Sequence, residues 1–351
     1  MTLTFEWRRG AAAWFRLGPQ WDALLESWGV DCPFLRWDWI RSWLRVYGRD
    51  GTPWLGIARN EAGLVGLAPL HAQRIPVAGG LLSLRTVRLA GDGPLCADHL
   101  VLPVAPGHEQ AFAEALVRDL FRQRHAWDRF EFRDLRGDHP AWRAVEAAAR
   151  SAGLDARTHL RTRCPYLPLP ATWEAYLDET GRHRRHQIRR ALRRFDADFE
   201  MKLERPASVR ETDALMSVLE DLHTRGWRAR GRPGVFGDAR FRRFHRLHAR
   251  RAYRRGTLWL LLLRAGERPA AVNFGFLSRR AVHSYQHGYE PALADYGPGM
   301  LVRLCAIRAS IERGLGEWDF LRGSAAYKRD FPSLQERRGH DLIVHRNTLA
   351  D

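Results

Sequence analysis

Residues 257–321 contain three apolar runs, a glycine loop, a helix-like segment and one more apolar run. The three runs read TLWLLLL (Thr257–Leu263), AAVNFGFL (Ala270–Leu277) and AVHSYQH (Ala281–His287), and only short turns separate them. Apolar runs of this length between turns are typical of buried strands. The order strand, strand, strand, loop, helix, strand predicts an α/β (α+β) domain in which helices flank a mixed sheet.

The loop between the third run and the helix contains Gly297-Pro-Gly299. A helix N-terminus has free N–H groups and the positive end of the helix dipole, so it binds phosphate groups well. Glycine lets the backbone approach a phosphate closely, and proline suits the first helical position because no N–H is needed there. The loop is therefore a candidate pyrophosphate site, and the alternative is an ordinary turn that starts a helix over Met300–Arg313.

The chain has 351 residues, which is roughly the length of two domains. Three prolines fall within Pro165–Pro170 and break regular structure there. We therefore predict an N-terminal domain over residues 1–163 and a C-terminal domain over residues 164–351 that carries the candidate pyrophosphate site.

The formal net charge is +17, and Lys202 and Lys328 are the only lysines beside 55 arginines. Because 40 acidic residues are interspersed with them, we predict a basic surface but do not favour a nucleic-acid groove, although a nucleic-acid partner stays open. A lysine retained in so arginine-rich a chain suggests that Lys328 makes a contact that needs a compact ammonium, such as one with a phosphate or an acceptor carboxylate. The alternative is a solvated surface lysine.

No apolar run reaches the ~18 residues that a membrane helix needs. The N-terminus lacks the pattern of a signal peptide, and Cys32, Cys96, Cys164 and Cys305 are too scattered for a disulfide framework. These features predict a cytoplasmic protein with reduced thiols. The paired histidines of the chain have no HExxH context, so we expect no metal site.

Residues 182–194 contain seven arginines around an apolar seam, which predicts an amphipathic helix. One interpretation is an anion-binding surface for a sugar nucleotide, a polysaccharide or RNA, with Arg189 and Arg190 as the candidate residues. The other interpretation is a solvated helix face. Trp227 could stack on a sugar ring, although a tryptophan of this kind more often belongs to the core.

The run from Gly288 to Leu301, together with Trp318–Gly323 and Tyr327-Lys328, resembles the GNAT-type acetyltransferase domain of the CelD/BcsL proteins. These are bacterial proteins often linked to the biosynthesis of cellulose or other exopolysaccharides. Shorter similarities at Pro33–Trp43, in the arginine-rich segment and at Leu222–Trp227 extend the resemblance over most of the chain. It implies two GNAT-like halves in tandem, as in the Fem-type aminoacyl transferases, with acyl-CoA as the expected donor.

The resemblance places Tyr296, Gly297, Gly299, Met300 and Leu301 at the donor site, where acetyl-CoA or another acyl-CoA would bind. The ordinary GNAT loop carries the pattern Gln/Arg-x-x-Gly-x-Gly/Ala at this position. Here the loop reads ADYGPG and lacks the basic first residue.

GNAT chemistry is a direct transfer in which an amine or hydroxyl attacks the thioester and a base removes the acceptor's proton. His287 ends the strand before the loop, so it is a candidate base or else a histidine that only packs. Asp319 alternates with apolar neighbours in a short strand, where a salt bridge and a catalytic role are both open. Tyr327 is a candidate acid that returns a proton to the thiolate.

The leading hypothesis is an acyl-CoA-dependent N- or O-acyltransferase that acts on a saccharide or an amine-bearing small molecule, in keeping with a role in exopolysaccharide or cellulose biosynthesis. A Fem-like transferase that takes its acyl group from aminoacyl-tRNA is a second hypothesis, favoured by the basic charge and the arginine-rich segment. A non-catalytic protein that binds polysaccharide or nucleic acid is a third. The sequence leaves the acyl chain, the attacking atom and the oligomeric state open.

Overall fold

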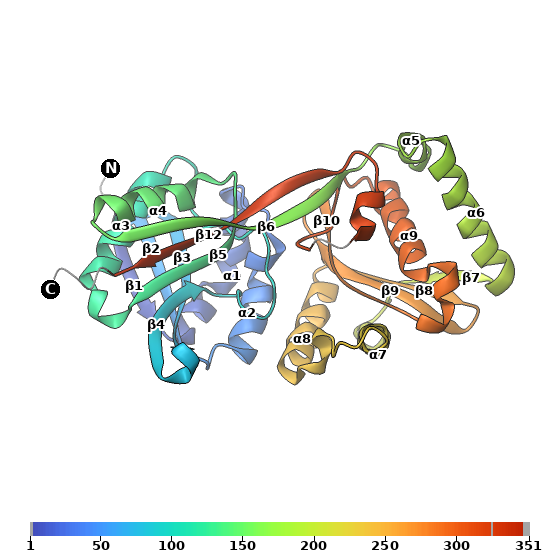
Figure 1. The fold of residues 1–351 in the computed structure, drawn as a ribbon. Coiled ribbons are helices and arrows are strands. Elements are labelled where there is room, and N and C mark those ends of the chain that lie inside the picture. The colour runs from blue at the N-terminus through green and yellow to red at the C-terminus, as the bar shows by residue number, and fades with distance from the viewer. Residues whose placement is uncertain (1–2, 324–325, 347–351) are drawn as a thin grey trace. The chain divides into compact units, whose positions relative to one another are not determined.

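The computed structural model describes residues 3–323 and 326–346, and the chain divides into two compact units (Figure 1). The first unit contains Met1–Arg163 and Arg337–Asp351, and the second contains Cys164–Glu336. The first unit is therefore built from two separate stretches of chain, with the whole second unit between them.

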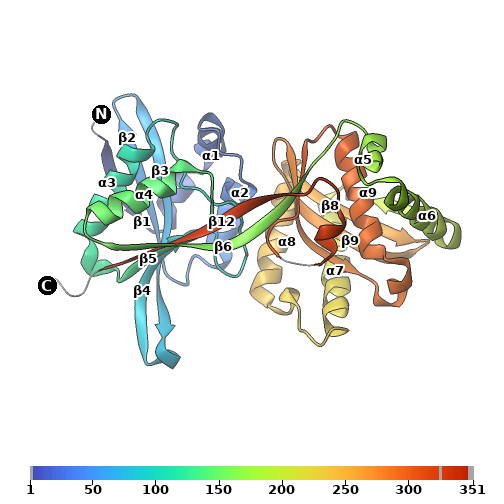
Figure 2. The same cartoon turned by 45° about the horizontal axis from the view of Figure 1, so that its top comes forward.

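The first unit is a mixed sheet flanked by helices. Its strand order is β1-β2-β3-β4-β5-β12-β6, and the pair α1 and α2 lies on the opposite face of this sheet from the pair α3 and α4 (Figure 2). Large aromatic side chains, among them Trp14, Trp21 and Trp39, fill its core. Its elements are β1 (Thr4–Arg9), α1 (Ala11–Ser27), the 3-10 helix η1 (Pro33–Leu35), α2 (Trp37–Val46), β2 (Thr52–Asn60), β3 (Gly63–Val77), η2 (Ala78–Gly80), β4 (Leu82–Leu89), α3 (Glu109–Arg122), η3 (Arg124–Ala126), β5 (Arg129–Arg136), α4 (Pro140–Ser151), the first part of β6 (Asp155–Pro168) and most of β12 (Gln335–His345).

The second unit has the strand order β6-β11-β10-β9-β8-β7. Helices α7 and α8 cover one face of its sheet, and α5, α6 and α9 lie on the other (Figure 1). Its elements are the last residues of β6, α5 (Trp173–Glu179), α6 (Arg182–Phe199), β7 (Met201–Glu204), α7 (Val209–Arg228), η4 (Val235–Gly237), α8 (Ala239–Arg254), β8 (Leu258–Ala265), β9 (Arg268–Leu277), β10 (Ala281–Tyr289), η5 (Pro291–Tyr296), α9 (Pro298–Glu312), β11 (Glu317–Asp319), η6 (Ala326–Asp330) and the start of β12.

The three apolar runs form β8, β9 and β10, so the predicted strands are confirmed. The helix after the glycine loop is confirmed as well, although it begins at Pro298, two residues before the predicted start, because proline occupies its first position. Most of α9 is buried, as its apolar sequence requires. Within the two described stretches of chain, no helix is both long and apolar enough to cross a membrane.

The two units repeat one topology. In each, three antiparallel strands are followed by a helix and by a strand that pairs in parallel with the third strand. In the first unit, Thr86–Arg88 of β4 pair with Arg129–Glu131 of β5. In the second, Ala281–His283 of β10 pair with Glu317–Asp319 of β11. The repeat confirms the predicted tandem organisation of the fold.

Candidate active site

The candidate site lies where β10 and β11 of the second unit stop pairing. The parallel pairing ends at His283 and Asp319, and a bulge between Ser284 and Gln286 follows in β10. β10 then continues to Tyr289, whereas β11 ends at Asp319. Ligands of α/β sheets bind beyond the carboxyl ends of the strands, so this is where a substrate is expected.

The glycine loop starts α9 close to the end of β10. Gly297 has a left-handed backbone (φ 61°), and its carbonyl accepts hydrogen bonds from the amides of Met300 (2.9 Å) and Leu301 (3.1 Å). Over the described part of the chain, the Gly299 amide has no hydrogen-bond partner. A Cβ built on Gly299 would lie 3.4 Å from Cδ1 of Tyr289. The loop thus offers a free N–H donor at the N-terminus of a fifteen-residue helix.

A basic residue reaches this loop from another part of the chain. Arg230, just after α7, donates a hydrogen bond of 2.7 Å to Oη of Tyr289, the side chain that lies against Gly299. The loop itself lacks the basic residue of the ordinary GNAT pattern, so Arg230 is a candidate replacement. Sequence spacing gives no sign of this contact, because Arg230 and Tyr289 lie on different elements.

Tyr296 anchors the loop to α6. Its hydroxyl donates to Asp198 (2.8 Å), its ring packs on Phe199, and the Arg194 guanidinium lies 4.3 Å from its ring centre. Tyr296 thus holds the loop in place, and its predicted contact with the donor stays a prediction.

His287 and Tyr327 come together, as two predicted catalytic residues should. Their ring centres are 5.9 Å apart, and the Cζ atom of Arg303 on α9 lies 3.8 Å from the Tyr327 ring centre. Burial and then the positive charge of Arg303 and other basic neighbours hold the pKa of His287 well below its usual range. His287 is therefore neutral at physiological pH, but it is a weak base.

Lys328 is buried rather than solvated, with 5% of its surface exposed. Its Nζ donates to the carbonyls of Phe320 (3.0 Å), Leu321 (2.9 Å) and Arg322 (2.8 Å). Leu321 has a left-handed backbone (φ 55°), which costs energy for a residue with a branched side chain. The compact ammonium thus fixes the turn after β11, and a contact between Lys328 and a substrate stays a prediction.

Asp319 is fully buried and has partners on both oxygens. Oδ1 accepts from the Leu321 amide (2.8 Å), and Oδ2 lies 3.2 Å from Nδ1 of His283. Nε2 of His283 lies 3.1 Å from Oγ of Ser278. The structure therefore supplies the ion-pair partner that the sequence left open, and a catalytic role for Asp319 stays a prediction.

The remaining candidates lie on α6 and α7. Arg189 donates to Glu174 (2.6 Å), and the exposed Arg190 lies next to it. A pocket of about 540 Å³ is lined by five side chains of α6: Arg182, His183, Arg185, His186 and Arg189. Trp227 is half-buried, with its ring centre 5.7 Å from that of His223. No contact between described residues joins Arg189, Arg190 or Trp227 to His287, Asp319 or Tyr327.

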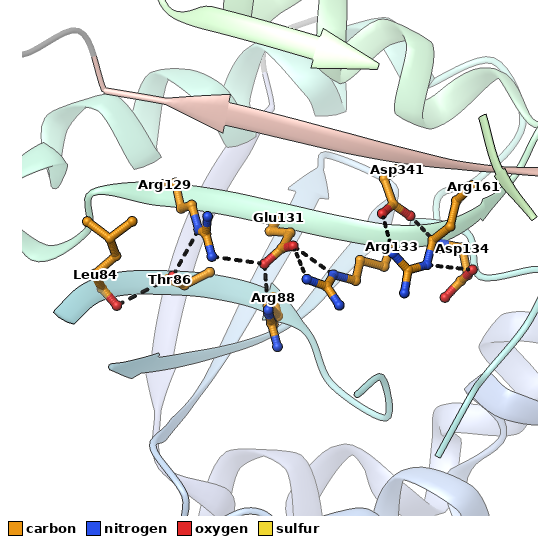
Figure 3. Close-up of polar contacts among 9 residues, drawn as sticks. All are labelled: Leu84, Thr86, Arg88, Arg129, Glu131, Arg133, Asp134, Arg161 and Asp341. Atoms are coloured by element: carbon orange, nitrogen blue, oxygen red, sulfur yellow. Dashed lines mark hydrogen bonds and ion pairs between the residues drawn. The ribbon is translucent and has the colours of Figure 1, made fainter. Parts of the chain in front are cut away.

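The equivalent strand pair of the first unit ends in a charge cluster. Glu131 of β5 accepts hydrogen bonds from Nη2 of Arg88 (2.6 Å) and Nε of Arg133 (2.7 Å), and Arg129 lies 3.6 Å away (Figure 3). Burial alone would raise the pKa of Glu131, but the two hydrogen-bonded arginines lower it. Glu131 is therefore held as an anion by the arginines around it.

Beyond this cluster, the segment of residues 100–104 lies between β5 and β3 and forms hydrogen bonds with both strands. The Leu100 amide donates to the carbonyl of Asp134 (3.1 Å), and the Arg136 amide donates to the carbonyl of Leu100 (2.8 Å). On its other side the same segment pairs with β3, where the Leu67 amide donates to the carbonyl of Pro103 (2.8 Å). The chain itself therefore occupies the position beside β5 where β4 no longer pairs.

Residues 182–329 match the acetyltransferase (GNAT) domain family. Among solved structures, the chain is similar to FemX, with a TM-score of 0.63 and 11% identity over 93% of this chain and 95% of that one. It is also similar to a conserved protein of unknown function from Bacteroides thetaiotaomicron, with a TM-score of 0.57 and 13% identity over 94% and 97% of the two chains. The fold is a tandem GNAT fold. No curated protein matches the chain.

The tandem GNAT fold confirms the predicted resemblance at the level of the GNAT domain, while the narrower CelD/BcsL assignment stays a prediction. The matched residues contain α9, the Gly297 loop and the β10–β11 pair, so the candidate site lies within the residues that match the GNAT domain family. No group of three or more His, Cys, Asp or Glu side chains could hold a metal ion over residues 3–323 and 326–346.

Proposed function

We propose that the second unit transfers an acyl group from acyl-CoA, acetyl-CoA in the first instance, to an amine or hydroxyl of a saccharide or small molecule. The observation that carries this proposal is the free Gly299 amide at the start of α9, next to the end of β10, in the GNAT domain. The amide and Arg230 would bind the donor's pyrophosphate, since both offer hydrogen-bond donors to an anion. CoA thioesters are intracellular, so the reaction belongs to the cytoplasm.

The proposed reaction needs no covalent enzyme intermediate. The acceptor's nitrogen or oxygen attacks the thioester carbon, the C–S bond breaks, and the CoA thiolate leaves. The acceptor loses one proton and the thiolate gains one, with His287 and Tyr327 as the candidate groups. The positive charges of Arg303 and Lys328 near His287 favour the negative charge that develops on the thioester oxygen. Asp319 keeps the turn after β11 in place through the Leu321 amide.

The resemblance favours a saccharide acceptor and a role in exopolysaccharide or cellulose biosynthesis. A second candidate donor, aminoacyl-tRNA, is favoured by the pocket on α6, whose lining consists of arginines and histidines. Arg185 and Arg189 of this pocket already pair with Asp178 and Glu174, which weakens its attraction for RNA. A non-catalytic binding protein would show neither donor binding nor turnover.

Calorimetry with acetyl-CoA tests the proposal. The wild type should bind one acetyl-CoA per chain with a Kd in the micromolar range. Gly299→Ala should weaken binding roughly 10- to 100-fold, because the added methyl group crowds the free amide while it meets Tyr289 only at an ordinary contact distance. Tight, salt-sensitive binding of RNA without saturable binding of acetyl-CoA would overturn the proposal in favour of the tRNA donor.

A further inference from the structure

Arg303 is the one buried arginine in the described part of the chain, with 4% of its surface exposed. It lies on α9, one turn after Gly299, and its guanidinium contacts the ring and hydroxyl of Tyr327. Several partly buried arginines pair with a carboxylate, as Arg88 does with Glu131 and Arg246 with Glu220. Arg303 has no such partner among the described residues.

A buried guanidinium without an anion is unfavourable. Burial removes the hydration of the Arg303 guanidinium and lowers its pKa. Arginine nevertheless keeps its proton in proteins, so the charge stays. Arginines are almost never fully buried unless they are paired. An anion that arrives with a ligand would supply the missing partner.

The charged groups around Arg303 would attract an anion from a ligand. The charged groups that act on His287, next to Tyr327, are Arg303, His223, Arg230 and Lys328, and all of them are basic. Lys328 directs its donors to three backbone carbonyls, whereas a guanidinium has five N–H donors, more than the Tyr327 hydroxyl can accept. Arg303 is therefore the cation of this cluster with donors to spare.

We propose that Arg303 binds a carboxylate of the acceptor, so that the acceptor is an amino acid, a peptide end or an acidic sugar. This inference rests on the proposed acyl transfer. A guanidinium fork matches a planar carboxylate with two parallel hydrogen bonds. The donor's phosphates are the other source of anionic oxygen. They are expected at the Gly299 amide and Arg230, whereas Arg303 lies about 6 Å further along α9.

An anion titration tests Arg303 without any acyl donor. Thermal unfolding is followed in sodium acetate and in sodium chloride at equal pH and ionic strength for the wild type, Arg303→Met, Arg303→Lys and Arg308→Met. Arg308 is the matched control, because it lies on the same helix but is exposed and paired with Glu312 (2.8 Å). Acetate should raise the Tm of the wild type and of R308M, raise that of R303K less, and leave that of R303M unchanged.

The Tm of R303M relative to the wild type in sodium chloride alone is a second test. R303M should unfold at a higher temperature than the wild type, because the substitution removes an unpaired buried charge. A lower Tm for R303M together with an intact acetate response would overturn the inference and make Arg303 a structural residue.

Kinetics with paired acceptors identify the source of the anion. Each pair consists of an amino acid and the amine that lacks its carboxylate, for example lysine and cadaverine. The wild type should prefer the acid in kcat/KM, and R303M should lose roughly 10- to 100-fold of this preference while its Kd for acetyl-CoA stays unchanged. A loss of acetyl-CoA affinity in R303M would overturn the acceptor assignment and give the anion to the donor. Turnover by the wild type without a preference would overturn the inference while the acyl transfer stands, and no turnover with any acceptor would count against the proposed function.

Discussion

The two units share one topology but differ where their parallel strands stop pairing. In the first unit, Glu131 is fixed by three arginines, and the chain around Leu100 continues the sheet beside β5. In the second unit, the equivalent position holds Asp319 and His283, and the helix that follows starts with a free amide at Gly299. The first unit therefore fills this position with a network of ion pairs and with its own chain, whereas the second unit places a single carboxylate–histidine pair there.

The loop after the third strand differs in the same sense. In the first unit it contains Asp92, which is buried and whose Oδ2 has no hydrogen-bond partner among the described residues. Burial, and to a smaller extent the nearby Asp134, raise the pKa of Asp92 to about 6. In the second unit this loop has glycines at 297 and 299 and Arg230 nearby. An anionic donor is therefore favoured by the second loop and opposed by the first.

The largest effect is expected from the matched variants Glu131→Gln and Asp319→Asn. E131Q leaves three arginines without their anion and should lower the free energy of unfolding of the first unit by about 3–5 kcal/mol. D319N keeps an acceptor for the Leu321 amide and should cost the second unit about 1 kcal/mol. Urea unfolding gives the energies, and hydrogen exchange of peptides from β5 and β11 assigns each transition to its unit. Equal losses would show that the two positions do not differ as described.

Asp92→Asn should stabilise the first unit at neutral pH. The pKa of Asp92 in the folded state, about 6, lies above the usual value for aspartate, so the ionised carboxylate costs stability. This cost is absent below pH 4, grows between pH 4 and pH 6, and is complete above pH 6. The gain at pH 8 should be on the order of 3 kcal/mol. Urea unfolding at pH 4 and pH 8 measures it. Asp138→Asn is the control with the opposite sign, because its hydrogen bond to Arg136 lowers the pKa of Asp138. A D92N gain that is the same at both pH values would contradict the assignment.

Arg230→Gln should produce the smallest change, about a 5- to 10-fold weaker binding of acetyl-CoA, because Arg230 is exposed and its charge is screened. Calorimetry compares R230Q with Arg228→Gln, an exposed arginine at the end of α7. Equal losses in the two variants would mean that only the overall charge attracts the donor, and that the loop has no basic residue of its own.

The fold of the second unit was predictable because its signals are local. Apolar runs between short turns fixed β8, β9 and β10, and a proline between two glycines marked the start of α9. Burial of the amphipathic seam in α6 at Ile188 and Phe195 likewise follows from spacing alone. The placement of the Leu100 segment beside β5 could not be predicted, because its hydrogen bonds join segments that are far apart in sequence.

The site residues divide along the same line. His287 and Tyr327 were predicted from their places beside the loop and in the motif after β11, and they do meet. His283 and Arg230 escaped notice because their partners lie on other elements. Arg303 could have been found from the sequence, because it is the one charged residue in the apolar first half of α9. A charge at such a position breaks the local pattern and indicates either a solvent-exposed side of the helix or a buried functional residue.

The strand β12 has a consequence for the order in which the protein can assemble. It supplies residues from Arg337 onward to the first unit and lies between β5 and β6 in the strand order. A ribosome must therefore complete all of the second unit before the first sheet can close. The first unit therefore cannot be completed by folding from the N-terminus domain by domain, which is the usual order in multidomain chains. The part that is synthesised first is therefore the last to be completed. Until β12 arrives, the edges of β5 and β6 lack their partner strand and are exposed to pairing with other chains.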